Sequence, residues 1–396
     1  MKIDSINFDL DQWRGKSSGE IQEEINRLEA IKMQRTNQEQ SIKLLINSIY
    51  GAYGSVYFIM YSTDIAESIT LQGQDIIKNA DRYINIYFNK HWHNDTQLHE
   101  ALGITSNVHQ IVSECTIYND TDSAYVSFDQ VLKSCDWKDD PKKFILSLYE
   151  LRLKDFLDNC FDQYAKKFGT KNLQNFEMEM ISESAIFIAK KKYILNPVWK
   201  DPGINIESLS KIKPKGVEMI QGSTPVFVRE KMVTFMKHIF KQKKDLKYSE
   251  FVRMLKDAKS EFMVQPIERI SMTKTINDYD KYIANDIPSS GDFSVRKQCP
   301  IHLRAAGYYN YLLNSNKKCK SKYEMIKSGN KVKYYHCQEE DVVFAYHTSS
   351  YPYEFAPKMN FDIQFEKTII APMNRVLEVL GFPPVPGNLI TTKRLF

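Results

Sequence analysis

A short acidic stretch, Tyr-Asn-Asp-Thr-Asp-Ser at residues 118–123, constrains the fold of this chain more than any other feature. The segments on either side, residues 112–117 and 124–128, are rich in β-branched, aromatic or small residues, as strands are. The sequence therefore predicts a β-hairpin whose tip carries Asp120 and Asp122. Two carboxylates on a rigid turn supply the hard oxygen ligands that Mg²⁺ prefers. If phosphates complete the coordination, the expected chemistry is phosphoryl transfer with two metal ions.

By itself an Asp-x-Asp pair is most often a solvated turn, because turns favour aspartate for local hydrogen bonds. Here its neighbours in the sequence matter. Lys-Leu-Leu-Ile-Asn-Ser-Ile-Tyr-Gly precedes it at residues 43–51, and Lys-Lys-Lys-Tyr follows at residues 190–193. These three motifs, in this order, resemble those of the family B DNA polymerases, and most closely the T-even phage type. The similarity extends through residues 222–225 and 299–304 to residues 365–370, so it covers nearly the whole chain.

The resemblance implies an α+β fold in three parts. Residues 1–54 would form the C-terminal half of the helical fingers. Residues 55–218 would form a palm, in which helices pack on an antiparallel sheet. Residues 219–388 would form a mostly helical thumb, and residues 389–396 a C-terminal tail.

The composition limits the remaining classes of protein. A chain of 396 residues with 42% apolar content can build two or three domains with sizeable cores. The net charge of +5 permits a polyanionic partner without demanding one. No apolar run approaches the ~20 residues that span a bilayer, and the N-terminus lacks a signal-peptide core. Six scattered cysteines indicate a reducing compartment without a disulfide framework, so the expected location is the cytoplasm, that of the host if the protein is viral.

A long helix is expected in the fingers part. Ser17 begins a helix-start pattern, and residues 34–50 continue or restart the helix. Helical spacing places Lys43, Asn47 and Tyr50 on one face. An apolar side is expected to pack, and its members are Ile42, Leu45, Ile46 and Ile49. Taken alone, this is an ordinary amphipathic helix with a solvated lysine. The resemblance implies instead that Lys43 binds the incoming triphosphate, Asn47 lines the same pocket and Tyr50 lies against the nascent base pair.

The resemblance also assigns roles within the hairpin. It implies that Asp122 is the palm ligand shared by two Mg²⁺ ions and that Asp120 is a secondary carboxylate. Asn119 stands where the family usually has glycine, and we expect it to take a left-handed turn position, which asparagine tolerates. Thr121 and Ser123 are expected to satisfy hydrogen bonds of the turn.

Candidate DNA contacts follow the hairpin. The resemblance implies that Lys191 reaches the minor groove near the primer terminus and that Tyr193, on the same side of a strand, contacts the primer backbone. Ser223 and Thr224 are predicted to cap a helix whose free amides could hold a DNA phosphate, and Arg304 lies in a further matching motif. Other basic candidates are Lys211, Lys213 and Lys215 on one strand face, and Lys241, Lys243, Lys244, Arg253, Lys256, Lys259, Lys317, Lys318, Lys320 and Lys322 in the thumb. A lysine-rich solvated surface is the ordinary alternative for these.

Two other groups of possible metal ligands are weaker. His91, His93 and His99 match no metal-binding spacing, and we expect exposed loop histidines. A second group has irregular spacing and only a small chance of binding zinc. Its members are Cys299, His302, Cys319, His336 and Cys337.

Parts of the family pattern are absent from this sequence. The second palm aspartate, in a motif of the form Asp-x-x-Ser-Leu-Tyr-Pro, is not found, and neither are the first fingers helix and the 3′→5′ exonuclease motifs. One carboxylate site cannot hold two metals for in-line displacement. We therefore expect the C-terminal subunit of a split polymerase or a fragment of a larger one. The initial Met and ordinary leader favour the natural split.

The expected reaction joins the primer 3′-hydroxyl to the α-phosphate of a dNTP on primer–template DNA. A partner chain would supply the missing aspartate and the exonuclease domain across a large apolar interface. Phage polymerases of this type bind a sliding clamp through a C-terminal peptide, which makes Leu395 and Phe396 candidate clamp anchors. The alternative is a non-catalytic DNA-binding or scaffold subunit of a replisome. A reverse transcriptase would need a Tyr-x-Asp-Asp hairpin, which this chain lacks.

Overall fold

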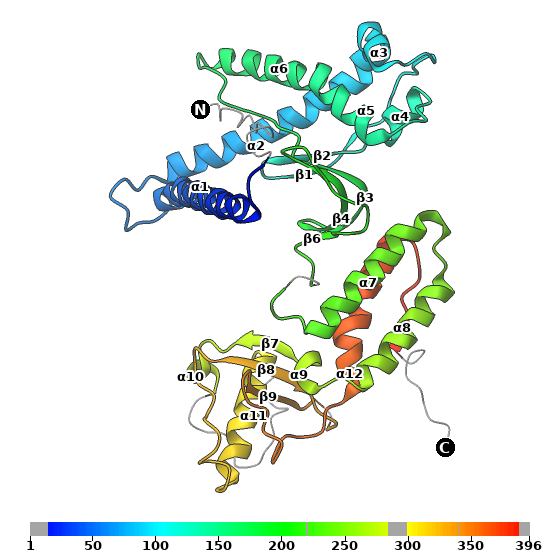
Figure 1. Ribbon diagram of the computed structural model, residues 1–396. Coiled ribbons are helices and arrows are strands. Elements are labelled where there is room, and N and C mark those ends of the chain that lie inside the picture. The colour runs from blue at the N-terminus through cyan, green and yellow to red at the C-terminus, as the bar shows by residue number, and fades with distance from the viewer. Residues whose placement is uncertain (1–14, 219–220, 284–298, 340, 388–396) are drawn as a thin grey trace. The chain divides into compact units, whose positions relative to one another are not determined.

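The computed structural model describes residues 15–218, 221–283, 299–339 and 341–387. The chain forms two compact units, residues 1–176 and 177–396 (Figure 1). Each unit combines helices with antiparallel strands, which confirms the predicted α+β class. The predicted palm, residues 55–218, spans the division between the two units, so the boundaries expected from the sequence stay a prediction.

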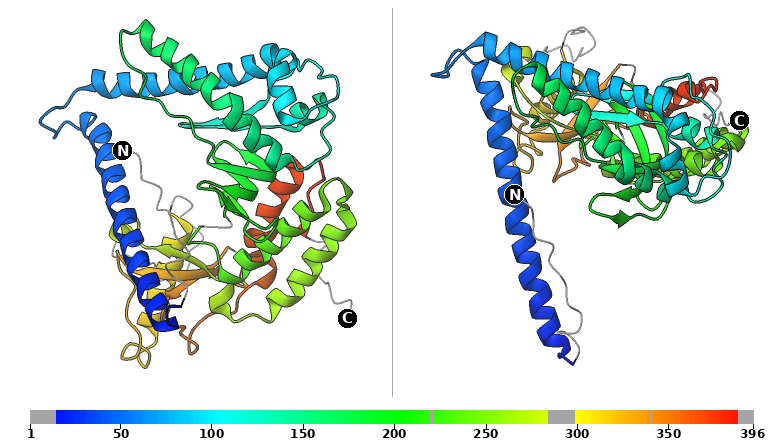
Figure 2. Two further views of the ribbon diagram at one scale, coloured as in Figure 1. Left: turned by 45° about the horizontal axis from the view of Figure 1, so that its top comes forward. Right: turned by 90° about the horizontal axis from the view of Figure 1, so that it is seen from above.

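The first unit begins with the long helix α1, Ser18–Tyr53, drawn as one continuous dark-blue helix in Figure 2. Ser17 caps it, and Glu20 bonds back to the Ser17 amide, which confirms the predicted helix start. The predicted packing of its apolar side is wrong within this chain, because no residue of α1 is buried. Such packing needs a facing surface, and the described part of the chain supplies none there.

Helix α2, Thr63–Ile86, crosses the same unit and continues through the π-helical turn Tyr87–His91. Residues 57–60, shortly before α2, form turns and a bend. His99 lies in the short helix α3, Thr96–Leu102, and is buried with its ring edge-on to Trp92. The expectation of an exposed loop histidine is therefore wrong for His99.

The hairpin strands are β1, Thr116–Asp120, and β2, Ser123–Val126. Helices follow in the order α4, Asp129–Ser134; α5, Pro141–Leu148; a π-helical turn, Tyr149–Leu153; and α6, Lys154–Lys167. Ala80 of α2 packs against Phe161 and Tyr164 of α6 in a small core. The Tyr164 hydroxyl also donates a hydrogen bond to the carboxylate of Asp75 on α2. Helices α2 and α6 are therefore joined by both apolar and polar contacts.

The second unit opens with an antiparallel sheet around a central strand. Its strands are β3, Met180–Ala189; β4, Lys192–Lys200; β5, Ile204–Asn205; and β6, Lys213–Lys215. Strand β4 pairs with all the others. Because β4 is central, most of its residues are buried.

Helices and a second sheet complete this unit. The sheet is β7–β8–β9, Met272–Thr275, Lys331–His336 and Val343–His347, and it was not anticipated in a thumb expected to be mostly helical. The helices are α7, Val226–Gln242; α8, Tyr248–Met263; α9, Ile267–Ile270; α10, Tyr279–Tyr282; α11, Ile301–Ser315; α12, Phe361–Phe365; and α13, Ala371–Val379, with a π-helical turn at Glu366–Ile370 before α13 and a 3₁₀ turn at Lys243–Asp245 after α7. Together they enclose one continuous core.

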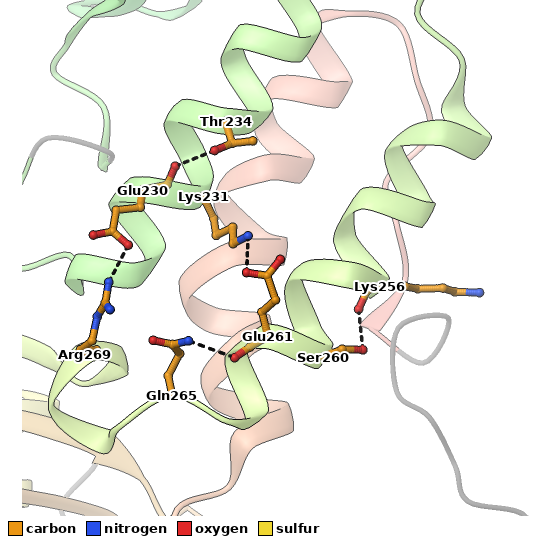
Figure 3. Close-up of polar contacts among 8 residues, drawn as sticks. All are labelled: Glu230, Lys231, Thr234, Lys256, Ser260, Glu261, Gln265 and Arg269. Atoms are coloured by element: carbon orange, nitrogen blue, oxygen red, sulfur yellow. Dashed lines mark hydrogen bonds and ion pairs between the residues drawn. The ribbon is translucent and has the colours of Figure 1, made fainter.

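Ion pairs join the helices at the surface of this core. Figure 3 shows Lys231 of α7 bound to Glu261 of α8 at 2.5 Å, and Glu230 of α7 bound to Arg269 of α9 at 2.6 Å. Exposed pairs of this kind contribute roughly 0–1 kcal/mol each, so the apolar core holds the helices together. All six cysteines are free, as the composition indicated. No helix in the described ranges is long and apolar enough to cross a bilayer.

Candidate functional site

The β1–β2 hairpin presents its two carboxylates at different depths. Asp120 pairs with Ser123 at the end of the ladder, which leaves Thr121 and Asp122 as the turn. Asp120 is 9% exposed, whereas Asp122 is open to solvent. The predicted hairpin is therefore present with a tighter tip than expected. Asp122 is the carboxylate that a ligand from outside can reach.

The backbone of this turn corrects one expectation. Thr121, with a φ of 50°, occupies the left-handed conformation, and Asn119 lies within β1 opposite Ala124. Asn119 therefore does not take the turn position predicted for it. A β-branched residue at positive φ is strained. The hydrogen-bonded pairing of β1 with β2 stabilises the turn in this conformation. Within the turn, the Asp122 amide lies 2.5 Å from the Asp120 carbonyl oxygen.

Side chains of the turn bond as predicted. The Thr121 hydroxyl donates to Asp120 at 3.2 Å, and the Ser123 hydroxyl donates to Asp122 at the same distance. Carboxylate oxygens on a short turn are the donors that Mg²⁺ prefers. In the part of the chain that the structure describes, no three His, Cys, Asp or Glu side chains gather into a metal site. Within the described residues, Asp120 and Asp122 are therefore not joined by a third such side chain.

An asparagine on α2 fixes the base of the hairpin. The Asn85 side-chain oxygen accepts from the amides of Cys115 at 2.7 Å and Thr116 at 3.3 Å, and its nitrogen donates to the Thr116 hydroxyl at 2.8 Å. These bonds tie the start of β1 to the helix beneath. Sequence reasoning missed Asn85, because a single asparagine in a helical pattern carries no signal of a distant partner.

The proposed nucleotide-binding face lies on α1. Lys43, Asn47 and Tyr50 are all exposed on one continuous helix, as their spacing predicted. The Lys43 ammonium lies 2.9 Å from the carboxylate of Glu39, and the Tyr50 hydroxyl is 2.9 Å from that of Thr70 on α2. Both charges of the lysine pair are more than half exposed, so a bound phosphate could displace the carboxylate at little cost.

Lys191 and Tyr193 do not share a side in the second unit. Lys191 sits in the turn between β3 and β4 with a φ of 62° and is exposed. Tyr193 is 2% exposed within β4 and packs on Phe187, with the Lys215 ammonium 5.5 Å from its ring. The prediction failed because strand alternation does not continue through a turn. Lys191 is therefore exposed at the turn, whereas Tyr193 is buried in the sheet.

Strand β6 lies beside this turn. Lys213 and Lys215 are exposed on one face with Pro214 between them, as the alternation predicted, and Lys213 lies 3.6 Å from Glu179. Gly216 follows with a φ of 67°, and a Cβ there would lie 1.9 Å from the Lys191 carbonyl oxygen. The close approach of these two backbones brings the lysines of β6 next to the Lys191 turn.

Other predicted DNA contacts are placed differently from expectation. Pro225 is the N-cap of α7, and no hydroxyl caps this helix. Thr224 instead donates to the Glu218 carbonyl at 2.5 Å, and Ser223 lies 3.4 Å from the side chain of Gln221. The predicted hydroxyl cap is therefore wrong. Pro225 occupies the N-cap position, and the Thr224 hydroxyl is used in a bond to another segment.

Three basic residues of the predicted thumb also have defined environments. Arg304 stands in the first turn of α11, and its Nε is buried with no partner among the described residues. Lys259 is buried and bound to Asp362, so it is not a DNA contact. Lys243 is paired with Glu183 at 2.6 Å. The candidate clamp residues lie outside the described residues.

Comparison with known proteins shows similarity over both of the segments that carry the main candidate residues. The model of DNA polymerase family B matches residues 14–138, which include the α1 face and the β1–β2 hairpin. The DNA-directed DNA polymerase of Escherichia phage RB69 is 26% identical over 345 residues, 79% of this chain and 34% of the relative. That of Enterobacteria phage T4 is 26% identical over 294 residues, 71% of this chain and 29% of the relative. The chain is thus similar to family B DNA polymerases over most of its length.

The family-model match and the two phage relatives confirm the resemblance that the motifs indicated, to the T-even phage type. The similarity reaches beyond phages, since the DNA polymerase of Choristoneura biennis entomopoxvirus is 30% identical over 167 residues, 40% of this chain and 17% of the relative. The chain spans about a third of the length of the two phage relatives. Most of a family B polymerase of that size is therefore not represented in this sequence.

Proposed function

We propose that this chain is the C-terminal subunit of a DNA-directed DNA polymerase. It would extend a primer 3′-hydroxyl with dNTPs on a DNA template once a partner chain completes the site. The observation that carries this proposal is the β1–β2 turn, which holds Asp122 open to solvent above a shielded Asp120. The similarity to family B polymerases supports the reaction class, because both phage relatives are named DNA-directed DNA polymerases.

The carboxylates of the turn are proposed to hold Mg²⁺, with Asp122 shared by two ions and Asp120 in a secondary role. When bound, Mg²⁺ neutralises developing phosphate charge and favours the ionised primer hydroxyl. The exposed oxygens of Asp122 suit this ligand. Asp120 accepts from Thr121 below, and that bond would keep the turn in shape as charge accumulates above it.

The α1 face is proposed to bind the incoming dNTP. Lys43 would exchange its exposed contact with Glu39 for the triphosphate, as a mobile point charge can. Asn47 would line the same pocket. The Tyr50 ring, held through its hydroxyl by Thr70, would lie against the nascent base pair.

The second unit is proposed to position primer–template DNA by backbone contacts, which carry no sequence information themselves. Lys191, at the exposed turn, is the main primer contact, and Tyr193 supports it from below. Further proposed phosphate contacts are Lys213, Lys215, Ser223, Thr224 and Arg304. At the C-terminal tail, Leu395 and Phe396 are proposed as anchors for a sliding clamp.

The partner chain is proposed to carry the second palm aspartate and the exonuclease domain. An apolar patch after α1 supports a docking surface for it. The patch is exposed over the loop and the start of α2, and its members are Val56, Tyr57, Ile59, Met60, Tyr61, Ile65, Ile69 and Leu71. Contiguous exposed apolar patches mark interaction sites, and obligate interfaces are more apolar than transient ones.

Primer extension tests the proposal directly. Tagged chain is purified alone and as the complex that it retains from its native source, and Mg²⁺-dependent extension is measured for both. We expect extension by the complex only. Asp122→Asn in the complex should lower extension by about 100-fold or more, the scale of losing one preorganised charge at a reacting centre. The matched control is Asp129→Asn, at an exposed aspartate just beyond the hairpin, which should leave extension unchanged.

The alternative is a non-catalytic DNA-binding or scaffold subunit. The retained Lys43 and Asp122 argue against it, because a scaffold needs neither. Full extension by the Asp122→Asn complex would refute the catalytic role. Absence of extension in every preparation, together with retained binding of duplex DNA, would establish the scaffold function.

A further inference from the structure

The connection from α11 to β8, residues 316–331, concentrates positive charge, and we call it the lysine loop. Its lysines are Lys317, Lys318, Lys320, Lys322, Lys327 and Lys331, and its acidic residue is Glu324. Six lysines and one glutamate give a net charge of +5, which equals the formal net charge of the whole chain. The rest of the chain is therefore neutral as a whole, and the excess positive charge resides in this loop.

The backbone of the lysine loop is anchored to the core of the second unit. Cys319, Tyr323 and Ile326 are 6%, 8% and 1% exposed. The buried Asn310 side chain of α11 donates to the Ile326 carbonyl at 2.9 Å and accepts from the Ile326 amide at 2.8 Å. The lysines thus project from a backbone that is already ordered without a ligand.

Most of the charge in this loop has no counter-charge of its own. All six lysines are exposed, and Lys322 is paired with the Glu354 carboxylate. The other five form no ion pair within the ranges that the structure describes. Like charges held close together repel one another and destabilise the compact state. A polyanion bound at the loop would offset that repulsion.

The end of helix α11 explains only part of this set. Lysines complement the negative end of a helix, but the effect fades within about one turn. Because α11 ends at Ser315, Lys317 and Lys318 lie close enough to act in this way. Lys327 and Lys331 follow more than ten residues later, and Lys331 already belongs to β8. The helix end therefore does not require a loop of this charge.

We propose that the lysine loop binds the phosphate backbone of double-stranded DNA and supplies most of the salt-dependent affinity of this chain for DNA. The inference deepens the proposed function, since it rests on DNA as the partner, but it requires no catalytic site. Duplex DNA carries one negative charge per about 1.7 Å of its axis, so an irregular set of point charges can match it. Contacts of this kind are independent of base sequence.

The type of basic residue favours DNA over an acidic protein. All six basic residues of the loop are lysine and none is arginine. Arginine forms bidentate pairs of fixed geometry, whereas lysine acts as a compact point charge. A dense row of phosphates needs only neutralisation, whereas recognition of a single acidic side chain gains from bidentate geometry. Double-stranded DNA therefore fits the loop better.

Salt-dependent DNA binding tests this inference on the single chain. Binding to a fluorescein-labelled duplex is followed by fluorescence anisotropy between about 50 and 200 mM NaCl, a range over which backbone contacts weaken steeply. Lys317, Lys318 and Lys320 are replaced together by glutamine, with circular dichroism as the folding control. Each lost phosphate contact lowers the slope of log Kd against log salt by about 0.9. We expect a slope lower by about 2–3 and a Kd raised at least about tenfold.

The matched control replaces Lys166, Lys167 and Lys171 by glutamine. These three exposed lysines stand at and just beyond the end of α6, and their loss changes the net charge by the same amount. The control should leave both the slope and Kd unchanged. Equal slopes for the two triple variants would overturn the proposal, because net charge alone would then account for binding. A natural chain without salt-dependent binding would overturn it as well.

Poly-glutamate serves as the competitor that distinguishes the two classes of partner. We expect it to displace duplex DNA poorly at equal concentration of charge. Displacement as effective as that by unlabelled duplex would overturn the proposal in favour of an acidic protein partner. The measurements use neither nucleotide nor the partner chain, so failure of this inference is distinguishable from failure of the proposed polymerase reaction.

Discussion

At the scale of single residues, Gly216 allows the backbone of the Lys191 turn to lie close to the end of β6. Its positive φ and its approach to the Lys191 carbonyl oxygen leave no room for a side chain. Neither property is visible in the sequence, where Lys-Gly reads only as the end of a basic strand. The position of the proposed primer contact thus depends on a residue that has no chemistry of its own.

Gly216→Ala is therefore expected to destabilise the chain and to displace the Lys191 turn. The matched control is Gly203→Ala in the same sheet, where φ is 72° but no atom lies within 4 Å of the added Cβ. The control should lose about 1–2 kcal/mol of unfolding free energy, the cost of a left-handed alanine. Gly216→Ala should lose clearly more. Equal losses in urea titrations of the two variants would show that the close approach is not rigid.

At the scale of elements, a buried lysine joins α8 to α12. Lys259 donates to the Phe361 carbonyl at 3.0 Å and to the Asp362 carboxylate at 2.6 Å, and its ammonium lies 5.1 Å from the Phe365 ring. Burial lowers the pKa of Lys259, and the bond to Asp362 opposes that change. The Lys259 ammonium thus connects α8 to α12 through three contacts, with a carbonyl, a carboxylate and an aromatic ring.

Lys259→Ala should cost about 2–4 kcal/mol of unfolding free energy, because it removes a packed stem together with its bonds to the Phe361 carbonyl and the Asp362 carboxylate. Lys256→Ala is the control on the same helix, and Figure 3 shows its side chain directed away from the neighbouring helices. It should change stability by less than about 0.5 kcal/mol. Lys259→Met, which keeps the stem, should fall between the two. Indistinguishable denaturation curves for Lys259→Ala and Lys256→Ala would contradict this account.

Elements were predictable to different degrees. The start of α1 and the β1–β2 hairpin followed from local signals, a capping box and turn residues between strand-like runs. The turn between β3 and β4 was misjudged, because a two-residue alternation was carried through Lys191. The hydroxyl cap at Thr224 failed, because its hydroxyl bonds to the Glu218 carbonyl from a different segment. Contacts between distant segments leave no local trace in the sequence.

At the scale of the whole molecule, two buried or half-buried histidines, His336 and His302, make the folding stability depend on pH. Burial lowers the pKa of His336, and the nearby positive charges of Lys367 and Arg304 lower it further. Burial followed by the charge of Lys274 lowers the pKa of His302. In the unfolded chain both would return to the ordinary value near 6.5. Unfolding below that pH therefore takes up protons, and acid favours the unfolded state.

Stability should accordingly fall as the pH drops from about 7.5 to about 5.5, by no more than about 1.4 kcal/mol per histidine for each pH unit below 6.5. Carboxylates whose pKa is lowered, such as Glu183, titrate below this window. His336→Gln should flatten the dependence of the urea midpoint on pH. An unchanged slope in that variant would assign the acid response to other groups.

The division into two units also shows what sequence reasoning could not reach. Composition and motif order indicated the family and the α+β class, because they depend on residue types and spacing. The boundary between residues 176 and 177 depends on which long-range contacts form. In the sheet β7–β8–β9, the paired strands β7 and β8 are likewise far apart in the sequence. The same holds for Asn85, whose partners lie about one helix and one loop away.

The β1–β2 hairpin has a consequence for the handling of this protein in a cell. Within the described residues β1 and β2 pair only with each other, and Ile117 of β1 is more than half exposed. An uncovered strand edge is a template on which another extended chain can add. Newly made copies would then be prone to aggregation until something covers that edge. The rate of synthesis would then influence how much folded protein accumulates.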